Sequence, residues 1–311
     1  MKKMPVIIDC DPGHDDAIAL IIACASEKLD LKAVTVVGGN QTLDKTLCNA
    51  KKILNFVGRR PPLAAGAAKP LFRELETAPD FHGESGLDGP QIPDPTDYKE
   101  ETVTAWDLIH SIIMENPEPV TLISTGPLTN IGILFTAHPE IKRNIARVSL
   151  MGGSLFAGGN KTSAAEFNIF VDPEAAEIVF SSGVPITMCG LDVTHKALIF
   201  PEEVETLRKA GRVGKLVAEL IDFYFCVYMK LGFKGAALHD PCAVVALTAP
   251  DLFRTKDFHV DIETKGTLTR GMTLVDLRSW SEAESNVTAC LDVDRVALIQ
   301  LLHDACISYG L

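Results

Sequence analysis

The chain alternates at least five times between a short apolar run, a polar turn and a segment with a helical pattern of apolar residues. The apolar runs cover residues 6–8, 31–37, 120–124, 147–151 and 186–189. Such alternation favours parallel strands joined by right-handed crossovers, with helices on both faces of the sheet. No linker or repeat in the sequence requires a second domain. We therefore predict one α/β domain over residues 1–311 with a mostly parallel, Rossmann-like central sheet.

The segments outside this pattern are less regular. Residues 69–97 are rich in Gly, Pro, Asp and Glu, and a loop of this length in a compact domain is usually functional or disordered. Residues 201–231 are predicted to form two helical segments, and most aromatic residues of the second are more typical of a core stripe than of a site. The alternative is that the segment from Phe223 to Tyr228, together with His82, lines a binding pocket. The remainder predicts a helix over 238–248, strands near Phe258, Met272 and Val287, and a final helix from Asp294.

Four carboxylates, those of Asp9, Asp11, Asp15 and Asp16, lie within the eight residues DCDPGHDD after the first apolar run. The following Pro-Gly turn and helical pattern place them at the carboxyl end of a strand, where open α/β sheets bind ligands. Four like charges repel one another unless a cation or hydrogen-bond donors offset them, and oxygen ligands suit Ca²⁺ or Mg²⁺ better than zinc. Helix capping is the alternative, but it accounts only for Asp15 and Asp16.

Composition limits the classes of partner. A net charge of -12 argues against nucleic acid or an anionic membrane, because phosphate binding needs a basic surface. The 8 cysteines are scattered without a CxxC motif, which is typical of reduced core residues in a cytosolic protein. The short apolar run before Asp9 predicts neither a signal peptide nor a membrane span. We therefore expect a cytoplasmic protein.

Six motifs follow one another along nearly the whole chain: DCDPGHDDA, GGN, STGPLTN, MGG, AEFNIFVDPEAA and LHDP. In this order they resemble the inosine-uridine preferring nucleoside hydrolase family, most closely its pyrimidine-preferring members. The resemblance implies the nucleoside hydrolase fold and Ca²⁺-dependent hydrolysis of the N-glycosidic bond of uridine or cytidine to ribose and free base. It further implies a role in nucleoside salvage and a homotetramer or homodimer.

The resemblance also assigns individual residues. The implied Ca²⁺ ligands are Asp11, Asp16, Asp240 and the backbone carbonyl of Thr125. Asp11 would activate water on one face of the sugar and His239 would protonate the departing base, as an oxocarbenium-like transition state requires. His82, in the long loop, either contacts the base or is an ordinary surface histidine. The residues expected to bind the ribose are Asp15, Asn40, Asn160, Glu166 and Asn168.

Three alternatives stay open. A hydrolase with purine or broad specificity is one. A metal-dependent phosphohydrolase of the haloacid-dehalogenase type shares the Asp9-Cys10-Asp11 spacing, but Pro12-Gly13 departs from its motif and no phosphate-binding nest is recognisable in the sequence. A ribose or nucleoside binder without catalysis would have lost the base, the acid or a metal ligand, and all of these are present.

Overall fold

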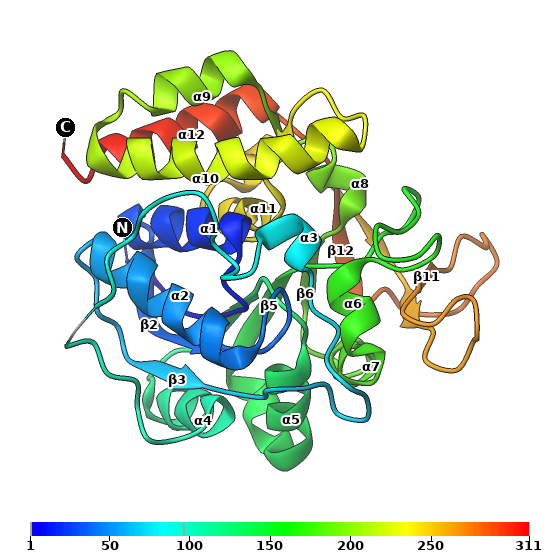
Figure 1. The fold of residues 1–311 in the computed structure, drawn as a ribbon. Coiled ribbons are helices and arrows are strands. Elements are labelled where there is room, and N and C mark those ends of the chain that lie inside the picture. Colours follow the sequence, from blue (N-terminus) through cyan, green and yellow to red (C-terminus); the bar gives the residue numbers. More distant parts are fainter. Residues whose placement is uncertain (1, 96, 311) are drawn as a thin grey trace.

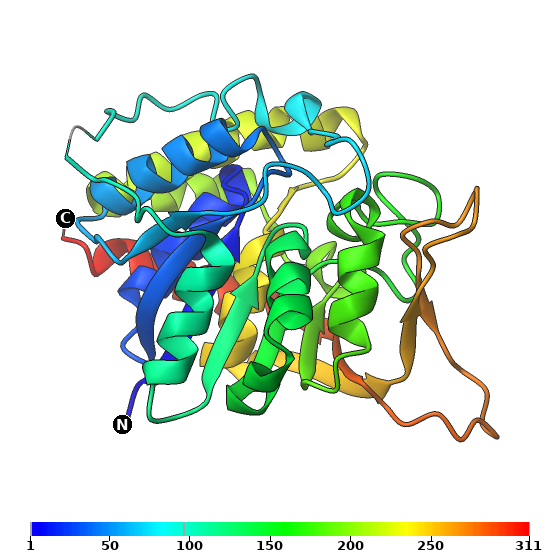
Figure 2. The same cartoon turned by 90° about the horizontal axis from the view of Figure 1, so that it is seen from below.

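The computed structural model describes residues 2–95 and 97–310, and an eight-stranded sheet forms its centre (Figures 1 and 2). The strand order is β3-β2-β1-β4-β5-β6-β12-β9. All neighbouring pairs are parallel except β12 and β9. The strands are β1 (Met4–Cys10), β2 (Leu29–Val36), β3 (Leu63–Ala65), β4 (Val120–Ser124), β5 (Ile145–Met151), β6 (Ile186–Cys189), β9 (Phe253–Phe258) and β12 (Val287–Val293). The predicted α/β class with a mostly parallel sheet is confirmed.

β1 lies between β2 and β4, where the strand order reverses. Its Asp9 is in register with Thr35 of β2 on one side and with Ser124 of β4 on the other. The turns that follow these three strands therefore meet at one edge of the sheet. A reversal of strand order at the carboxyl edge opens a crevice in sheets of this kind.

The two faces of the sheet bury separate cores, because successive side chains of a strand point to opposite sides. Val6 and Ile8 of β1 pack into one core, and Ile7 between them packs into the other. The first core is covered by α1 (His14–Ala25), α2 (Leu43–Phe56), α9 (Pro201–Leu207), α10 (Gly211–Lys230), α11 (His239–Thr248) and α12 (Arg295–Ile307). The second is covered by α4 (Ala105–Glu115), α5 (Thr129–Ala137) and α7 (Pro173–Phe180) (Figure 1).

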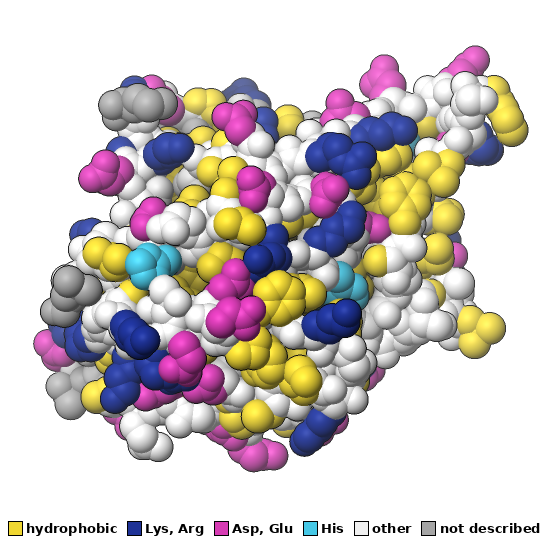
Figure 3. Space-filling model, turned by 90° about the horizontal axis from the view of Figure 1, so that it is seen from above, with side chains coloured by type: hydrophobic (Ala, Val, Ile, Leu, Met, Phe, Trp, Pro, Cys, Tyr) yellow, Lys and Arg dark blue, Asp and Glu magenta, His cyan; other side chains and the backbone are white. Residues whose placement is uncertain are grey.

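Short elements complete the described part of the chain. They are α3 (Pro79–His82), α6 (Phe167–Val171), α8 (Leu191–Thr194), η1 (Pro139–Asn144), η2 (Pro250–Leu252), β7 (Leu198–Ile199), β8 (Ala236–Ala237), β10 (Val260–Ile262) and β11 (Thr273–Val275). None of the helices in residues 2–95 and 97–310 has the length and apolar character needed to cross a membrane. Basic and acidic side chains are interspersed over the face drawn in Figure 3.

The C-terminal strands differ most from the predicted parallel pattern. β9 runs antiparallel to β12, because the connection between them carries the β10–β11 hairpin instead of a crossover helix. The strand predicted near Met272 is β11, which pairs with β10 in an arm that projects from the body (Figure 2). β9 exposes its four central residues, as suits a charged edge strand. The long loop over 69–97 also contains the short helix α3, which the sequence did not predict.

Candidate active site

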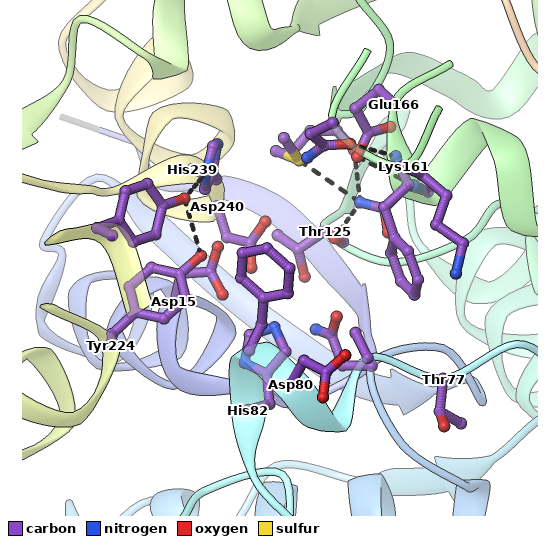
Figure 4. A pocket seen from close by; sticks show the side chains of 18 residues that line it. Asp15, Thr77, Asp80, His82, Thr125, Lys161, Glu166, Tyr224, His239 and Asp240 are labelled. Carbon is purple, nitrogen blue, oxygen red and sulfur yellow. Dashed lines mark hydrogen bonds between the residues drawn. The ribbon is translucent and has the colours of Figure 1, made fainter. Parts of the chain in front are cut away.

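A pocket opens at the carboxyl edge of the sheet, where the turns after β1, β2 and β4 meet (Figure 4). Nine of the eleven predicted site residues line it: Asp15, Asn40, His82, Thr125, Asn160, Glu166, Asn168, His239 and Asp240. The other two, Asp11 and Asp16, are fully buried and contact pocket residues from below. The fold thus brings all of the predicted residues to one place, although they come from segments spread over most of the chain.

The floor of the pocket, as we name it, consists of Asp11, Asp15, Asp16 and Asp240. One carboxylate oxygen of Asp15, of Asp16 and of Asp240 lies within 4.8 Å of the other two. Asp15 and Asp16 lie in the first turn of α1 and Asp240 in the first turn of α11. A helix N-terminus favours negative charge, so two helix dipoles help to hold these carboxylates together.

Burial and mutual repulsion disfavour the ionised form of the floor carboxylates. Burial, followed by the charge of Asp16, raises the pKa of Asp15 to about 8 and that of Asp11 well above its usual range. Burial, followed by the charge of Asp15, also raises the pKa of Asp240 well above its usual range. Lys161, which also lines the pocket, pairs with Glu76 at 3.0 Å. Its charge is therefore already matched by a carboxylate outside the floor.

Hydrogen bonds fix the orientation of two floor residues. Asp16 accepts from the hydroxyl of Thr125 at 2.7 Å, the N–H of Gly13 at 3.0 Å and the side-chain amide of Asn40 at 3.1 Å. Asp11 Oδ2 accepts from the N–H of Asn40 at 2.7 Å. Asp11 Oδ1 is buried without a hydrogen-bond partner among the described residues. An orphaned carboxylate oxygen beside three further acidic groups fits a hard divalent cation.

Two glycines of the predicted motifs allow this close packing. A Cβ atom on Gly39, in GGN, would lie 2.1 Å from Asp11 Oδ2, and one on Gly126, in STGP, would lie 2.5 Å from Asp11 Oδ1. Any side chain at either position would collide with the carboxylate. The glycines are therefore needed for space, and they hold Asp11 in one position.

Asp9, the first carboxylate of the DCDPGHDD motif, does not line the pocket. Its Oδ1 accepts from the hydroxyl of Thr35 at 2.5 Å and from the amide of Asn130 at 2.8 Å. Asn130 in turn accepts from the N–H of Ala67 at 2.8 Å. Asp9 thus joins β1, β2, α5 and the chain after β3, and it supports the turns that carry the floor.

The aromatic wall, as we name it, consists of His82, Tyr224, Tyr228 and His239. The hydroxyl of Tyr228 hydrogen-bonds Nε2 of His239 and lies 3.3 Å from the hydroxyl of Tyr224. His239 Nδ1 contacts the hydroxyl of Thr194 at 2.7 Å. Burial lowers the pKa of His239 to about 3, so its ring is neutral at pH 7. The wall therefore presents a neutral chain of O–H and N–H groups to the pocket.

His82 is buried in the wall, so the alternative of a surface-loop histidine is wrong. α3 carries it over the pocket, and its ring stacks on Tyr224 with centroids 5.7 Å apart. His14 packs against both rings, with its Nδ1 3.2 Å from His82 Nδ1 and its Nε2 2.8 Å from the carbonyl of Asp88. His14 itself does not line the pocket. This packing anchors the long loop to α1.

Tyr224 and Tyr228 are site residues that the sequence reasoning assigned mainly to the core. They lie one helical turn apart on α10, so both face the same side and line the pocket. The pair of hydroxyl-bearing rings at i and i+4 was the available signal. A purely apolar core stripe has no hydroxyl groups, whereas a buried tyrosine hydroxyl usually needs a hydrogen-bond partner.

The third side of the pocket comes from the segment that leads into α6. Glu166 caps this helix by accepting from the N–H of Asn168 at 2.9 Å, and it also accepts from the N–H of Gly153 at 2.9 Å. Asn168 donates to the carbonyl of Thr125 at 2.8 Å. Asn160 accepts from the N–H of Phe167 at 2.9 Å. Each of these polar side chains is thus oriented by backbone groups while it lines the pocket.

Comparison with known proteins gives these features a context. The sequence model of the family described as "Inosine-uridine preferring nucleoside hydrolase" matches residues 6–300. A "Pyrimidine-specific ribonucleoside hydrolase RihA" of Citrobacter koseri is 50% identical over 311 residues, with 99% of each chain covered. The protein of the same name from Photobacterium profundum is 52% identical over 309 residues, covering 98% of this chain and 99% of its own.

A solved structure matches the fold over nearly the whole chain. The "Purine-Preferring Ribonucleoside Hydrolase from Gardnerella vaginalis" superposes with a TM-score of 0.91 at 31% identity, covering 98% of each chain. Because the family match extends over nearly the whole chain and the motifs that carry it converge on one acidic pocket, this protein belongs to the inosine-uridine preferring nucleoside hydrolase family and is a nucleoside hydrolase.

Proposed function

We propose that this enzyme hydrolyses the N-glycosidic bond of pyrimidine ribonucleosides such as uridine and cytidine, releasing ribose and free base in nucleoside salvage. The observation that carries the proposal is the acidic floor, with Asp15, Asp16 and Asp240 gathered in a pocket that also holds His239. Cleavage of a glycosyl bond passes through an oxocarbenium-like transition state. It needs an activated water on one side and a protonated leaving group on the other.

The preference for pyrimidines rests on similarity. The curated relatives named above as pyrimidine-specific are 50% and 52% identical to this chain, whereas the solved purine-preferring relative is 31% identical. Tyr224 and His82, stacked in the aromatic wall, offer flat faces against which a planar base can pack.

Ca²⁺ is the cation that we propose for the floor, with Asp11, Asp16, Asp240 and the carbonyl of Thr125 as ligands. The all-oxygen donor set supports this choice, because carboxylate oxygens of Asp15, Asp16 and Asp240 lie within 4.8 Å of one another. Asp11 is not part of that group of three, and its support as a ligand is its orphaned Oδ1. The carbonyl of Thr125 accepts one hydrogen bond from Asn168 and keeps a second lone pair. Asp15 is a further candidate ligand. A bound divalent cation orients water and substrate hydroxyls and lowers the pKa of water.

Asp11 is the proposed proton acceptor for the attacking water. Its Oδ1 has no partner among the residues that the structure describes, while the N–H of Asn40 holds Oδ2. The absence of side chains at Gly39 and Gly126 leaves the space that its two oxygens occupy. Without a cation, burial and the charge of Asp16 raise the pKa of Asp11. A divalent cation on the floor would offset this shift and keep the carboxylate ionised, as a proton acceptor must be.

His239, together with Tyr228, is the proposed proton source for the departing base. The neutral ring carries one N–H, and hydroxyl groups lie at both of its nitrogens, Tyr228 at Nε2 and Thr194 at Nδ1. To act as the acid, the ring first takes up a proton from water; the imidazolium then gives this proton to the departing base and returns to its neutral form. Because His239 directly precedes Asp240 in the chain, the proposed acid lies next to the floor.

The ribose hydroxyls are the proposed partners of the remaining polar side chains. Backbone groups already orient Asn160, Glu166 and Asn168, so little side-chain freedom is lost when a sugar binds. Contacts at many points allow binding energy to favour distortion of the ring towards the transition state. Deoxyribonucleosides are therefore expected to be poor substrates.

Incubation of the protein with uridine, cytidine, inosine and adenosine, with and without prolonged chelation, tests the proposal. Release of free base and reducing sugar is followed, and p-nitrophenyl phosphate serves as the control for a phosphohydrolase. We expect uridine and cytidine to be cleaved fastest and chelation to abolish cleavage until Ca²⁺ is restored. Faster cleavage of inosine would contradict the base preference, and cleavage that survives complete metal removal would contradict the role of the cation.

We propose further that residues 1–311 act as one nucleoside hydrolase domain, that the enzyme works in the cytoplasm and that it forms a homotetramer or homodimer. Hydrogen-bonded strands from both ends of the chain in one sheet support the single domain. Light scattering during size-exclusion chromatography and fractionation of the source cells test the other two proposals. A monomer at working concentration would contradict the oligomer.

A further inference from the structure

A second group of metal-binding side chains lies away from the pocket. α5 begins beyond the carboxyl end of β4 and runs back along the sheet, so its last turn lies towards the amino ends of the strands. His138 follows that last turn, and Glu140 lies in η1 directly after it. His110 comes from α4, which lies beside α5 (Figure 1). These three residues therefore meet at the end of the sheet opposite the pocket.

The distances between their ligand atoms suit one small cation. His110 Nε2 lies 3.6 Å from Glu140 Oε1, and His138 Nδ1 lies 3.5 Å from the same oxygen. One ligand atom from each residue lies within 4.8 Å of the other two. Zinc holds nitrogen and oxygen ligands at about 2.0–2.1 Å in a tetrahedron, and the edges of such a tetrahedron are about 3.4 Å long. Two of the three edges are thus nearly at the required length.

The side chains are also accessible and close together. The two imidazole rings stack with centroids 4.1 Å apart, and a rotation of one ring about its side-chain bonds lets both nitrogens face one metal. The side chains of His110 and His138 are 28% and 30% exposed, and that of Glu140 is 50% exposed. A metal can therefore enter from solvent, and the open side leaves room for a water as the fourth ligand.

The chemistry of this group differs from that of the pocket floor. Two imidazoles and one carboxylate suit borderline cations such as Zn²⁺, Co²⁺, Ni²⁺ or Cu²⁺, whereas the oxygen-only floor suits a hard cation. We propose that His110, His138 and Glu140 form a binding site for a borderline divalent metal, with Zn²⁺ as the natural occupant, that ties α4 to the end of α5. The site is separate from the pocket, so its occupation is expected to stabilise the protein without changing the rate of nucleoside hydrolysis.

Titration of the full chain, without a polyhistidine tag and in excess Ca²⁺ at pH 7.5, tests the proposal. Zn²⁺ binding is measured by calorimetry, and the visible absorption of added Co²⁺ reports tetrahedral coordination. We expect one Zn²⁺ per chain at this site and at least a tenfold loss of affinity in His110→Ala and in Glu140→Gln. At a free Zn²⁺ concentration 100 times Kd, the unfolding temperature should rise by about 5 °C.

His303→Ala is the matched control. This histidine is 25% exposed and lies 3.8 Å from Asp304, so it has a similar acidic neighbour, and it belongs to none of the metal-binding groups found in the described residues. Its substitution should leave Zn²⁺ affinity unchanged. Circular dichroism of each metal-free variant checks that the fold is retained.

Two results would overturn the proposal. Zn²⁺ binding that is as tight in His110→Ala as in the unaltered protein would place the metal elsewhere, most simply on the pocket floor. The absence of saturable Zn²⁺ binding would leave His110, His138 and Glu140 as an ordinary group of surface ion pairs.

Discussion

The floor of the pocket carries its charges beside the ends of the central strands and on the first turns of two helices, whereas the aromatic wall comes from a loop helix, α10 and the start of α11. Backbone N–H groups and close glycines fix Asp11 in the floor. Side-chain hydroxyls and ring stacking hold the wall. The comparison indicates that the floor supplies rigid charge and the wall supplies neutral donors and shape. Changes in the floor should therefore cost more activity than changes in the wall.

The largest effect is expected from Asp16→Asn. The substitution keeps the size of the side chain but removes one charge from the floor, and Asp16 accepts four hydrogen bonds that orient its neighbours. Loss of the cation forfeits several kcal/mol of transition-state stabilisation, so kcat should fall by about 1,000-fold or more. Steady-state kinetics with uridine and equilibrium dialysis with Ca²⁺ measure the two losses. Full Ca²⁺ affinity in this variant would break the assignment of the floor.

A smaller but still large effect is expected from His239→Ala. General acid catalysis contributes about 100- to 10,000-fold, so kcat should fall within this range while Ca²⁺ affinity stays close to that of the unaltered protein. A substrate with a better leaving group, such as p-nitrophenyl riboside, should recover most of the rate. If only the proton donor is lost, the variant should cleave p-nitrophenyl riboside much better than uridine. If Asp240 is displaced, the floor is damaged and both substrates should be cleaved more slowly by the same factor.

The hydroxyl of Tyr228 sharpens the description of the wall. Tyr228→Phe keeps the ring in its tilted contact with Tyr224 but removes the hydrogen bond to His239, and we expect kcat to fall by about tenfold with KM little changed. Tyr224→Phe is the matched control on the same helix face, because its hydroxyl contacts Tyr228 at 3.3 Å and not His239. Equal losses in both variants would argue against a special role for the Tyr228–His239 contact.

The smallest effect is expected in the stability of metal-free protein as a function of pH. Burial raises the pKa of Asp15 to about 8 from an ordinary value of 3.8. A raised carboxyl pKa contributes stability that is fully present below the unfolded pKa and is lost as the pH rises through the folded pKa. The unfolding temperature of chelated protein should therefore fall between pH 5 and about pH 8.

Ca²⁺ should remove most of this pH dependence, because it favours the ionised floor. Its stabilising effect should accordingly be larger at pH 8 than at pH 6, which thermal unfolding at both values can measure. Asp16→Asn serves as the control, since one repelling charge is already absent. A pH-independent unfolding temperature in chelated protein would show that the floor carboxylates are not strained in the absence of metal.

The local parts of the structure were largely predictable. The strand over 120–124 and the final helix from Asp294 appear as β4 and as α12 with Asp294 as its N-cap, because apolar periodicity and capping residues act over a few neighbouring residues. The antiparallel β9 was not predictable in this way. Whether a strand pairs in parallel depends on the path of its connection, and short apolar runs near the C-terminus look alike in either direction.

The candidate site divides along the same line. The chain by itself determined the floor, because its carboxylates follow strand ends or begin helices within recognisable motifs, and parallel strands bring such ends to one edge. Only the tertiary structure decided that Tyr224 and Tyr228 face the pocket and that α3 buries His82 against His14. It likewise brought His110 to His138 and Glu140. These contacts join segments distant in sequence, and their geometry depends on how helices pack over the sheet, which no local pattern encodes.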